Sequence, residues 1–317
     1  MELALYDQQE GYYGAGPPRI GRGGDFFTSV STGPLFGRLL AMLARQRWER
    51  CGRPADFMLV EQGAHDGQLA EDILAALDIP GACYGIVEPN PRYREVQRKR
   101  LGERVRWLDG LSQVPQASFL LSNELPDAFP VHVLRWVAGE WLELQVNEAL
   151  EWVPCPVVEA ELAAEVARLP QDVEEGHTVE VSLEALRWLR ALAAVRPAGG
   201  ILIADYGLDA EEIALRPAGT LRRYHAHQTD ERVLENLGRC DLTAHVHFTR
   251  LIEEAQALGL RVADYDLQGR FLTRLAAPWL REQEGRRMDA ATLRQFQSLT
   301  HPALMGRSFR CLLLECA

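Results

Sequence analysis

The sequence has almost no lysine, no long hydrophobic run and no net positive charge. Lys99 is the single lysine among the 34 basic residues of the 317-residue chain, and the net charge is −11. An acidic surface does not gather phosphate groups, which argues against broad binding to nucleic acid or to an anionic membrane. No apolar run approaches the roughly 20 residues of a membrane-spanning helix, and the N-terminal residues lack the pattern of a signal peptide. We therefore expect a cytoplasmic protein with no membrane insertion and no nucleic-acid partner.

The sequence also lacks a closely spaced pair of cysteines. Its six cysteines are scattered along the chain, at positions 51, 83, 155, 240, 311 and 316. The absence of a C-x-x-C pattern excludes a zinc ribbon, and cysteines placed in this way in an intracellular chain are expected to stay reduced.

Segments with the patterns of strands and helices alternate along the chain. Short apolar runs predict strands at 57–61, 84–88, 105–108, 119–121, 201–205, 262–265 and 309–315. Residue spacing predicts helices at about 34–48, 66–77, 91–101, 183–195 and 248–258. Between about 132 and 157, alternating residues and three tryptophans predict an inserted antiparallel meander. Strand–helix alternation is typical of parallel strands joined by crossover helices, so the predicted fold is α/β with a doubly wound sheet.

A glycine-containing turn follows the first predicted strand and precedes a helix. An acid at Glu61 and glycines at Gly63 and Gly67 match the pattern [DE]-x-G-x-G-x-G of loops that bind adenosylmethionine, except at His65. The dinucleotide pattern G-x-G-x-x-G fails twice, at His65 and Gln68. We therefore favour a methyltransferase over a dehydrogenase, with a plain strand-to-helix turn as the alternative.

Glu88 ends the second predicted strand, 21 residues after Gly67. A carboxylate at this place can accept hydrogen bonds from both hydroxyl groups of a ribose. The alternative is a solvated acid just before Pro89. Together with the glycine turn, the spacing favours a ribose-binding role for Glu88.

Polar residues follow the fourth predicted strand. Ligands of doubly wound sheets bind at the carboxyl ends of the strands, so Asn123 and Glu124 are expected to point into a cleft. A guanidinium group stays charged at neutral pH. The carboxylates of Glu124 and Asp127 can bind it and aim one nitrogen, which matters because methyl transfer needs the nucleophile in line and within about 3–3.5 Å of the carbon. The alternative for Glu124 is a helix cap.

Several separate blocks of the sequence resemble one known family. The sequence is similar to the MidA-like, or DUF185, family of class I S-adenosylmethionine-dependent methyltransferases. The mitochondrial member of that family is the complex I assembly arginine methyltransferase. The resemblance extends over nearly the whole chain and rests on separate blocks at residues 1–7 with 11–13, 24–29, 123–131, 205–207, 219–221 with Tyr224, and 241–246.

The resemblance implies a single class I (Rossmann-like) methyltransferase domain over residues 1–317, with a mostly parallel sheet, a reversed last strand and inserts at about 132–180 and 208–247. It implies S-adenosyl-L-methionine as the cofactor and a protein arginine as the methyl acceptor, on a respiratory complex I subunit or a similar protein. It also implies an N-terminal lid at about 1–50, with Thr28 and Ser29 near the methionine end of the cofactor. Asp109 is expected near the adenine, with a solvated loop as an equal alternative. No metal is expected at His245, which lies in one of these blocks.

Two departures from the family pattern leave alternatives open. His65 stands where the family has glycine, so its imidazole is expected either to crowd the carboxylate of the cofactor or to bind it. A catalytically degenerate assembly factor is therefore one alternative, and a small-molecule N- or O-methyltransferase is another. The second departure is that Met1 aligns with an internal motif of the family, from which we expect some leading residues to be absent.

Overall fold

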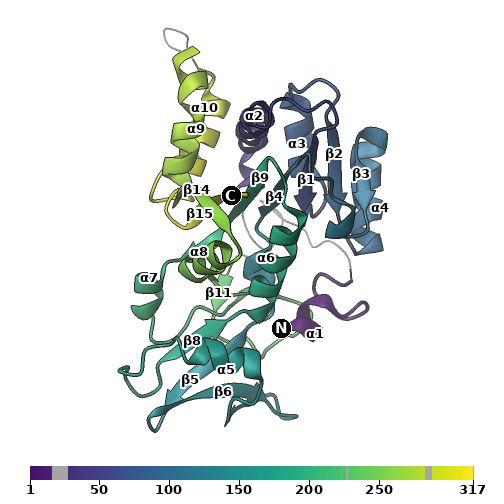
Figure 1. Cartoon of the computed structure of the whole chain (residues 1–317). Coiled ribbons are helices and arrows are strands. Elements are labelled where there is room, and N and C mark those ends of the chain that lie inside the picture. The colour runs from purple at the N-terminus through teal and green to yellow at the C-terminus, as the bar shows by residue number, and fades with distance from the viewer. Residues whose placement is uncertain (16–27, 226–227, 283–287, 317) are drawn as a thin grey trace.

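The computed structural model of the protein describes residues 1–15, 28–225, 228–282 and 288–316. Within these residues eight strands form a main sheet in the order β14-β15-β9-β4-β1-β2-β3, with β13 beside β9. Helices cover both faces of this sheet (Figure 1), which is the doubly wound α/β architecture that the sequence predicts. The strands are β1 (Met58–Gln62), β2 (Cys83–Val87), β3 (Arg106–Leu108), β4 (Ser118–Asn123), β9 (Gly200–Leu208), β13 (Val246–His247), β14 (Leu260–Leu267) and β15 (Phe309–Cys316).

The main sheet is parallel except for one strand, β15. Strands β3, β2, β1, β4 and β9 pair in parallel. Strand β15 runs antiparallel to both of its neighbours, β9 and β14. The last strand is therefore reversed, as expected, and it lies inside the sheet rather than at its edge.

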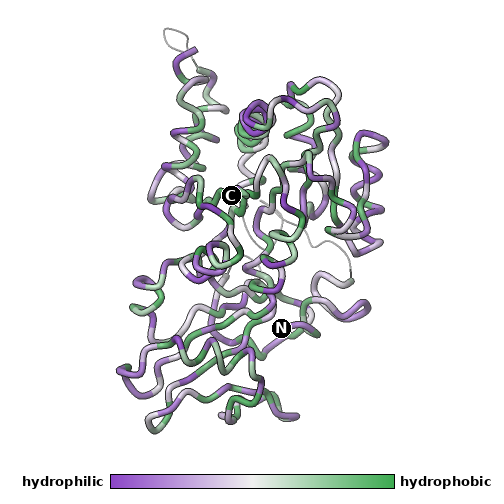
Figure 2. Tube along the Cα trace, in the orientation of Figure 1, coloured by the Kyte–Doolittle hydropathy of each residue, from purple (hydrophilic) through white to green (hydrophobic). Residues whose placement is uncertain are grey.

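Two hydrophobic cores form because successive residues of a strand face opposite sides of the sheet. Leu59 of β1 belongs to one core and Val60 to the other. Figure 2 shows hydrophobic residues concentrated along the central strands, with hydrophilic turns on α4. The first core is covered by α2 (Leu35–Arg50), α3 (Gln68–Ala76), α4 (Pro91–Leu101), α9 (Gln268–Glu282) and α10 (Ala290–Thr300), and the second by α6 (Leu183–Val195) and α8 (Phe248–Ala257).

Two smaller antiparallel sheets extend the molecule away from α9 and α10 (Figure 1). One contains the meander expected near residues 132–157, in the order β7-β6-β5-β8: β5 (His132–Val137), β6 (Glu140–Val146), β7 (Trp152–Cys155) and β8 (Thr178–Val181). The other has the order β11-β10-β12: β10 (Arg222–His225), β11 (Gln228–Asp230) and β12 (Asp241–Thr243). The remaining helices are α1 (Glu2–Tyr6), α5 (Ala160–Val166), α7 (Ala210–Ala214), η1 (Val30–Thr32), η2 (Gly102–Arg104), η3 (Leu111–Gln113) and η4 (Pro126–Ala128).

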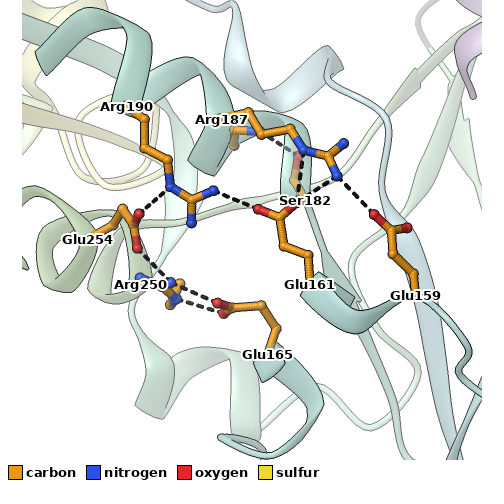
Figure 3. Close-up of polar contacts among 9 residues, drawn as sticks. Glu159, Glu161, Glu165, Ser182, Arg187, Arg190, Arg250 and Glu254 are labelled. Atoms are coloured by element: carbon orange, nitrogen blue, oxygen red, sulfur yellow. Dashed lines mark hydrogen bonds and ion pairs between the residues drawn. The ribbon is translucent and has the colours of Figure 1, made fainter. Parts of the chain in front are cut away.

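A chain of ion pairs ties α5, which packs with the four-stranded sheet, to two helices of the main sheet (Figure 3). Acids and arginines of α5, α6 and α8 alternate in it, in the order Arg187–Glu161–Arg190–Glu254–Arg250–Glu165, with N···O distances between 2.6 and 2.8 Å. Charge alternation lets each group face partners of opposite sign, so a shared network replaces isolated surface pairs. Among the described residues, no helix is both long and apolar enough to cross a membrane.

Replacing Arg250 by methionine should lower the free energy of unfolding by about 1.5–3 kcal/mol, the usual size of hydrogen bonds to charged groups. Its guanidinium contacts both Glu165 and Glu254, and the three side chains are 16%, 12% and 11% exposed. The variant leaves two largely buried carboxylates without that cation. Urea unfolding followed by circular dichroism measures the change.

The matched control is Arg45→Met, because Arg45 also contacts two carboxylates, Glu49 and Asp78, but at the surface, where the three side chains are 48%, 36% and 79% exposed. Such a surface pair contributes roughly 0–1 kcal/mol. Equal unfolding midpoints for the two variants would show that the Arg250 contacts add nothing beyond a surface pair.

Candidate active site

A cavity of about 1630 Å³ lies at the carboxyl ends of β1, β2 and β4. The chain passes from β1 to β2 and β3 on one side and then to β4 and β9 on the other, which makes β1/β4 the switch point of the sheet. Ligands of doubly wound folds bind at this place. The volume exceeds the roughly 300–1,000 Å³ of most small-molecule pockets. It therefore has room for a cofactor and for part of a second molecule.

The glycine loop (residues 62–67) forms the floor of the cavity at the end of β1. Its backbone is in the left-handed region at Gly63, His65 and Gly67, with φ of 76°, 46° and 83°. A Cβ atom on Gly63 would stand 3.0 Å from Leu125 Cδ1. Glycine at this position lets the turn approach the segment that follows β4, and the same bare backbone is open to a ligand.

His65 fits the turn although the family pattern has glycine there. Histidine accepts left-handed backbone angles more readily than most residues, and Gln97 Nε2 holds the turn by donating to the His65 carbonyl at 2.9 Å. The imidazole lines the cavity and meets the Tyr93 ring edge-on at 5.6 Å. The ring has one buried nitrogen, Nε2, without a hydrogen-bond partner among the described residues.

Two predicted acids, Glu61 and Glu88, stand on neighbouring strands beside this loop. Tyr84 Oη donates to Glu61 Oε2 at 2.6 Å, and burial raises the pKa of Glu61 to about 7. Glu88 is 7% exposed and accepts from the Asn90 amide at 2.9 Å. Burial also raises the pKa of Glu88. Both side chains line the cavity, and the Asn90 contact fixes where the Glu88 carboxylate points.

The structure brings eight predicted residues to the cavity wall and keeps three away from it. The eight are Thr28, Glu61, Gly63, His65, Glu88, Asn123, Glu124 and Asp127. Ser29 is fully buried behind the wall, and Gly67 lies at the start of α3. The Asp109 side chain is 73% exposed and pairs with Arg94 at 2.9 Å instead of facing the cavity. The predicted residues 24–27 lie outside the described part of the chain.

Glu124 and Asp127 follow β4 and stand together in a buried acidic group. Glu124 is held at φ 51°, and its Oε1 atom accepts from the Ser29 amide at 3.2 Å and from Asn123 Nδ2 at 3.0 Å. Burial raises the pKa of Glu124 to about 7 despite these two donors. Burial and then the nearby carboxylates of Asp205, Asp241 and Glu124 raise the pKa of Asp127 well above its ordinary value.

Sequence reasoning assigned no role to two further acids of this group, Asp205 and Asp241. Asp205 ends the buried part of β9 and accepts the backbone amides of Leu125, Asp127 and Tyr206 at 3.1, 3.3 and 2.6 Å. Asp241, on β12, lines the cavity. Both residues lie in blocks that carry the family resemblance, which was the available signal. We call Glu124, Asp127, Asp205 and Asp241 the acidic cluster.

Aromatic side chains surround the acidic cluster on the side of α1. Tyr6, Tyr13, Tyr206 and Tyr224 line the cavity. The rings of Tyr6 and Tyr13 stack with their centroids 6.0 Å apart, and Tyr6 Oη donates to the Ala128 carbonyl at 2.8 Å. Carboxylates and the faces of aromatic rings both attract positive charge. A site that combines them therefore suits a planar organic cation.

Within the described residues no three His, Cys, Asp or Glu side chains are grouped to hold a metal ion. The sequence has two histidine pairs, His225 with His227 and His245 with His247, and His227 lies outside the described residues. In the second pair, His245 packs edge-on against Tyr206, and burial lowers its pKa to about 3. His245 is therefore a neutral ring that packs against Tyr206, a residue of the cavity wall.

Comparisons with known proteins agree with this geometry. Residues 39–266 match a family model described as "Putative S-adenosyl-L-methionine-dependent methyltransferase". A Burkholderia thailandensis crystal structure that holds S-adenosyl-homocysteine is 30% identical, covers 99% of this chain and 86% of its own, and has a TM-score of 0.87.

Curated relatives extend the similarity over the chain. The Drosophila melanogaster protein named "Protein arginine methyltransferase NDUFAF7 homolog, mitochondrial" is 30% identical, over 98% of this chain and 79% of its own length. The human protein arginine methyltransferase NDUFAF7 is 29% identical over 81% of this chain, which spans 64% of that relative.

One expectation from the sequence is corrected by these relatives. The predicted cytoplasmic location is wrong by this comparison, because the fly and human relatives are named as mitochondrial proteins. Charge, hydropathy and the absence of a secretory signal do not separate these two compartments, since both hold folded acidic proteins in water.

The family model, the relatives and the bound S-adenosyl-homocysteine of the structural neighbour all point to one chemistry. The chain therefore belongs to the family of S-adenosyl-L-methionine-dependent methyltransferases, and S-adenosyl-L-methionine is its cofactor.

Proposed function

We propose that the protein transfers methyl groups to the guanidinium nitrogen of arginine residues in a protein substrate. The observation that carries the proposal is the acidic cluster, which stands beside the glycine loop in a cavity larger than one small molecule requires. The names of the fly and human relatives support the same acceptor. A subunit of respiratory complex I or a similar protein is the acceptor we propose.

The residues around the glycine loop fit the cofactor. Gly63 and His65 both line the cavity, so the backbone at Gly63 and the imidazole of His65 lie where the cofactor would bind. Glu88 stands where a ribose would bind, at the end of β2. When bound, the cofactor supplies an electrophilic methyl group.

The acidic cluster would bind and aim the arginine. A guanidinium presents several N–H donors in one plane, so Glu124 and Asp127 can each accept from it while Tyr6 covers part of its face. The carboxylates hold one nitrogen in line with the methyl carbon, and a closed, oriented arrangement lowers the barrier to transfer. Methylation of a charged guanidinium releases one proton, which the carboxylate of Glu124 accepts in its ionised form.

The alternatives gain no separate support. A degenerate protein would need a glycine loop that excludes the cofactor, but His65 preserves the left-handed turn of the loop. A small-molecule acceptor would leave much of the cavity unfilled.

Glu88→Gln should weaken binding of S-adenosyl-homocysteine by about tenfold or more, because an amide replaces a charged acceptor for the ribose hydroxyls. Isothermal titration calorimetry gives the dissociation constant. Glu95→Gln is the control, since Glu95 lies on α4 with its side chain 68% exposed and pairs with Lys99 at the surface. An affinity that stays equal in both variants would remove Glu88 from the cofactor site.

Glu124→Gln should lower methyl transfer by about 100-fold or more while cofactor affinity stays within about threefold, because the change removes the charge that binds and deprotonates the guanidinium. Turnover is measured with radiolabelled S-adenosyl-L-methionine and the protein fraction of a mitochondrial extract. Glu211→Gln on the exposed end of α7 serves as the charge-matched control. Undiminished turnover would exclude Glu124 from the mechanism.

The acceptor itself is tested by hydrolysing the labelled extract proteins and separating the methylated amino acids. The expected product is methylated arginine in the protein fraction, absent when Glu124→Gln replaces the native protein. Label in methylated lysine, or in low-mass compounds, would contradict the proposed function and favour a different acceptor.

A further inference from the structure

Gln268 connects the helical pair α9–α10 to residues 28–35, several of which line the cavity. It is the first residue of α9 and is fully buried. Its Nε2 atom donates to the Leu299 carbonyl of α10 at 3.2 Å, which fixes the orientation of the amide. Its Oε1 atom is thereby directed to accept from Ser29 Oγ, at 3.1 Å. A buried amide with both ends occupied is a rigid connection.

Ser29 links Gln268 to Glu124, because it forms a hydrogen bond with each of them. It is fully buried, and its backbone N–H donates to Glu124 Oε1 at 3.2 Å. Its carbonyl accepts from Thr32 Oγ1 at 2.8 Å, within the turn that η1 forms. The hydroxyl, amide and carbonyl of Ser29 therefore each have a partner, and only the hydroxyl reaches the helical pair.

A second contact seats the same segment on α10. Gln295 Oε1 accepts from the Leu35 amide at the start of α2, at 3.0 Å. Gly33 has φ 126°, and a Cβ atom there would stand 2.6 Å from the side chain of Gln295. At the base of the pair, a Cβ on Gly269 would stand 2.3 Å from the Thr300 carbonyl. The pair is thus closely packed at its base and against both ends of residues 29–35.

Glu124 needs such support because nothing intrinsic keeps it in place. A non-glycine residue at φ 51° is in a sparsely populated backbone region, which persists only where surrounding contacts impose it. The groups that face its carboxylate are the Ser29 amide, the Asn123 amide and the carboxylates of Asp127 and Asp205. Only the first two stabilise the ionised form of Glu124, and both lower its pKa against the effect of burial.

We propose that Gln268 is a positioning residue, through which the helical pair α9–α10 holds the Ser29 amide on the carboxylate of Glu124. The proposal rests on the proposed function, in which Glu124 binds and orients the guanidinium. No residue of α9 or α10 lines the cavity. The connection nevertheless makes these two helices part of the machinery that sets the state of the acid.

The test compares Ser29→Ala, Gln268→Leu and the double variant. Ser29→Ala removes only the hydroxyl and leaves the amide, so it probes the connection with little risk to folding. Each single variant should lower maximal methyl transfer to extract protein by about tenfold, because one hydrogen bond contributes about a factor of ten. The affinity for S-adenosyl-homocysteine should stay within about twofold of the native value. The double variant should be no slower than the slower single one, because both break the same connection.

The pH profile gives a readout that a general loss of stability would not move. The native protein should gain activity as pH rises through about 7, where Glu124 ionises while the guanidinium stays charged. Loss of the Ser29 amide from the carboxylate raises the pKa of Glu124. The midpoint should therefore move to higher pH in all three variants. Gln297→Leu, an exposed glutamine of α10, should leave rate and midpoint unchanged.

Amide hydrogen exchange tests the contacts of residues 28–35 with α9 and α10 independently of catalysis. Residues 28–35 should exchange faster in Ser29→Ala and Gln268→Leu than in the native protein or in Gln297→Leu. Native exchange and a native pH midpoint in Ser29→Ala would overturn the proposal, even where Gln268→Leu fails to fold. Strictly additive rate effects would overturn it as well. Undiminished turnover in Glu124→Gln, by contrast, would refute the role of Glu124 in the proposed function. The exchange result would then report only on the contacts that hold residues 28–35.

Discussion

The geometry of the site depends on a carboxylate that does not line the cavity. Asp205 accepts three backbone amides, two of them from the segment that follows β4. Strands β4 and β9 are neighbours in the sheet, and the Glu124 amide also bonds to the Ala204 carbonyl at 2.9 Å. The segment carrying Glu124 and Asp127 is therefore fixed to the strand beside it through several hydrogen bonds at once, which a flexible loop could not provide.

This arrangement keeps like charges close together in a medium of low polarity. Burial and mutual repulsion favour the neutral forms of such carboxylates, which is why the pKa values of Asp127 and Asp205 are both raised. One extensive hydrophobic core on each face of the sheet stabilises the fold enough to offset this unfavourable burial of carboxylates. A cation that enters the cavity relieves the repulsion between the carboxylates. The repulsion that destabilises the empty site therefore favours binding of a guanidinium.

Much of the main sheet could be predicted because its signals are local. Apolar runs such as 119–121 lie in strands buried on both faces, and α6 occupies residues 183–195 as its helical spacing indicates. Glu61, Gly63 and Glu88 could be proposed because the loop and the strand ends have a fixed relation in this architecture. The sequence indicates α9 less clearly, because Pro278 lies inside that helix.

The rest of the site depends on contacts between distant parts of the chain. Asp241 reaches the acidic cluster from a separate small sheet, and no residue spacing encodes that approach. Asp109 follows the third strand as expected, but the guanidinium of Arg94 holds it at the surface. A sequence identifies which side chains carry charge, while the choice among several partners is settled only by tertiary packing.

The position of β15 has a consequence for how the chain is made. This strand, residues 309–316, lies between β9 and β14 and contributes Leu312 and Leu314 to one core and Leu313 to the other. A ribosome delivers it after β9 and β14, so neither strand has this neighbour until β15 has been synthesised. An unpaired strand edge is a template for other extended peptides. The topology therefore leaves the facing edges of β9 and β14 to be covered only once β15 has been made.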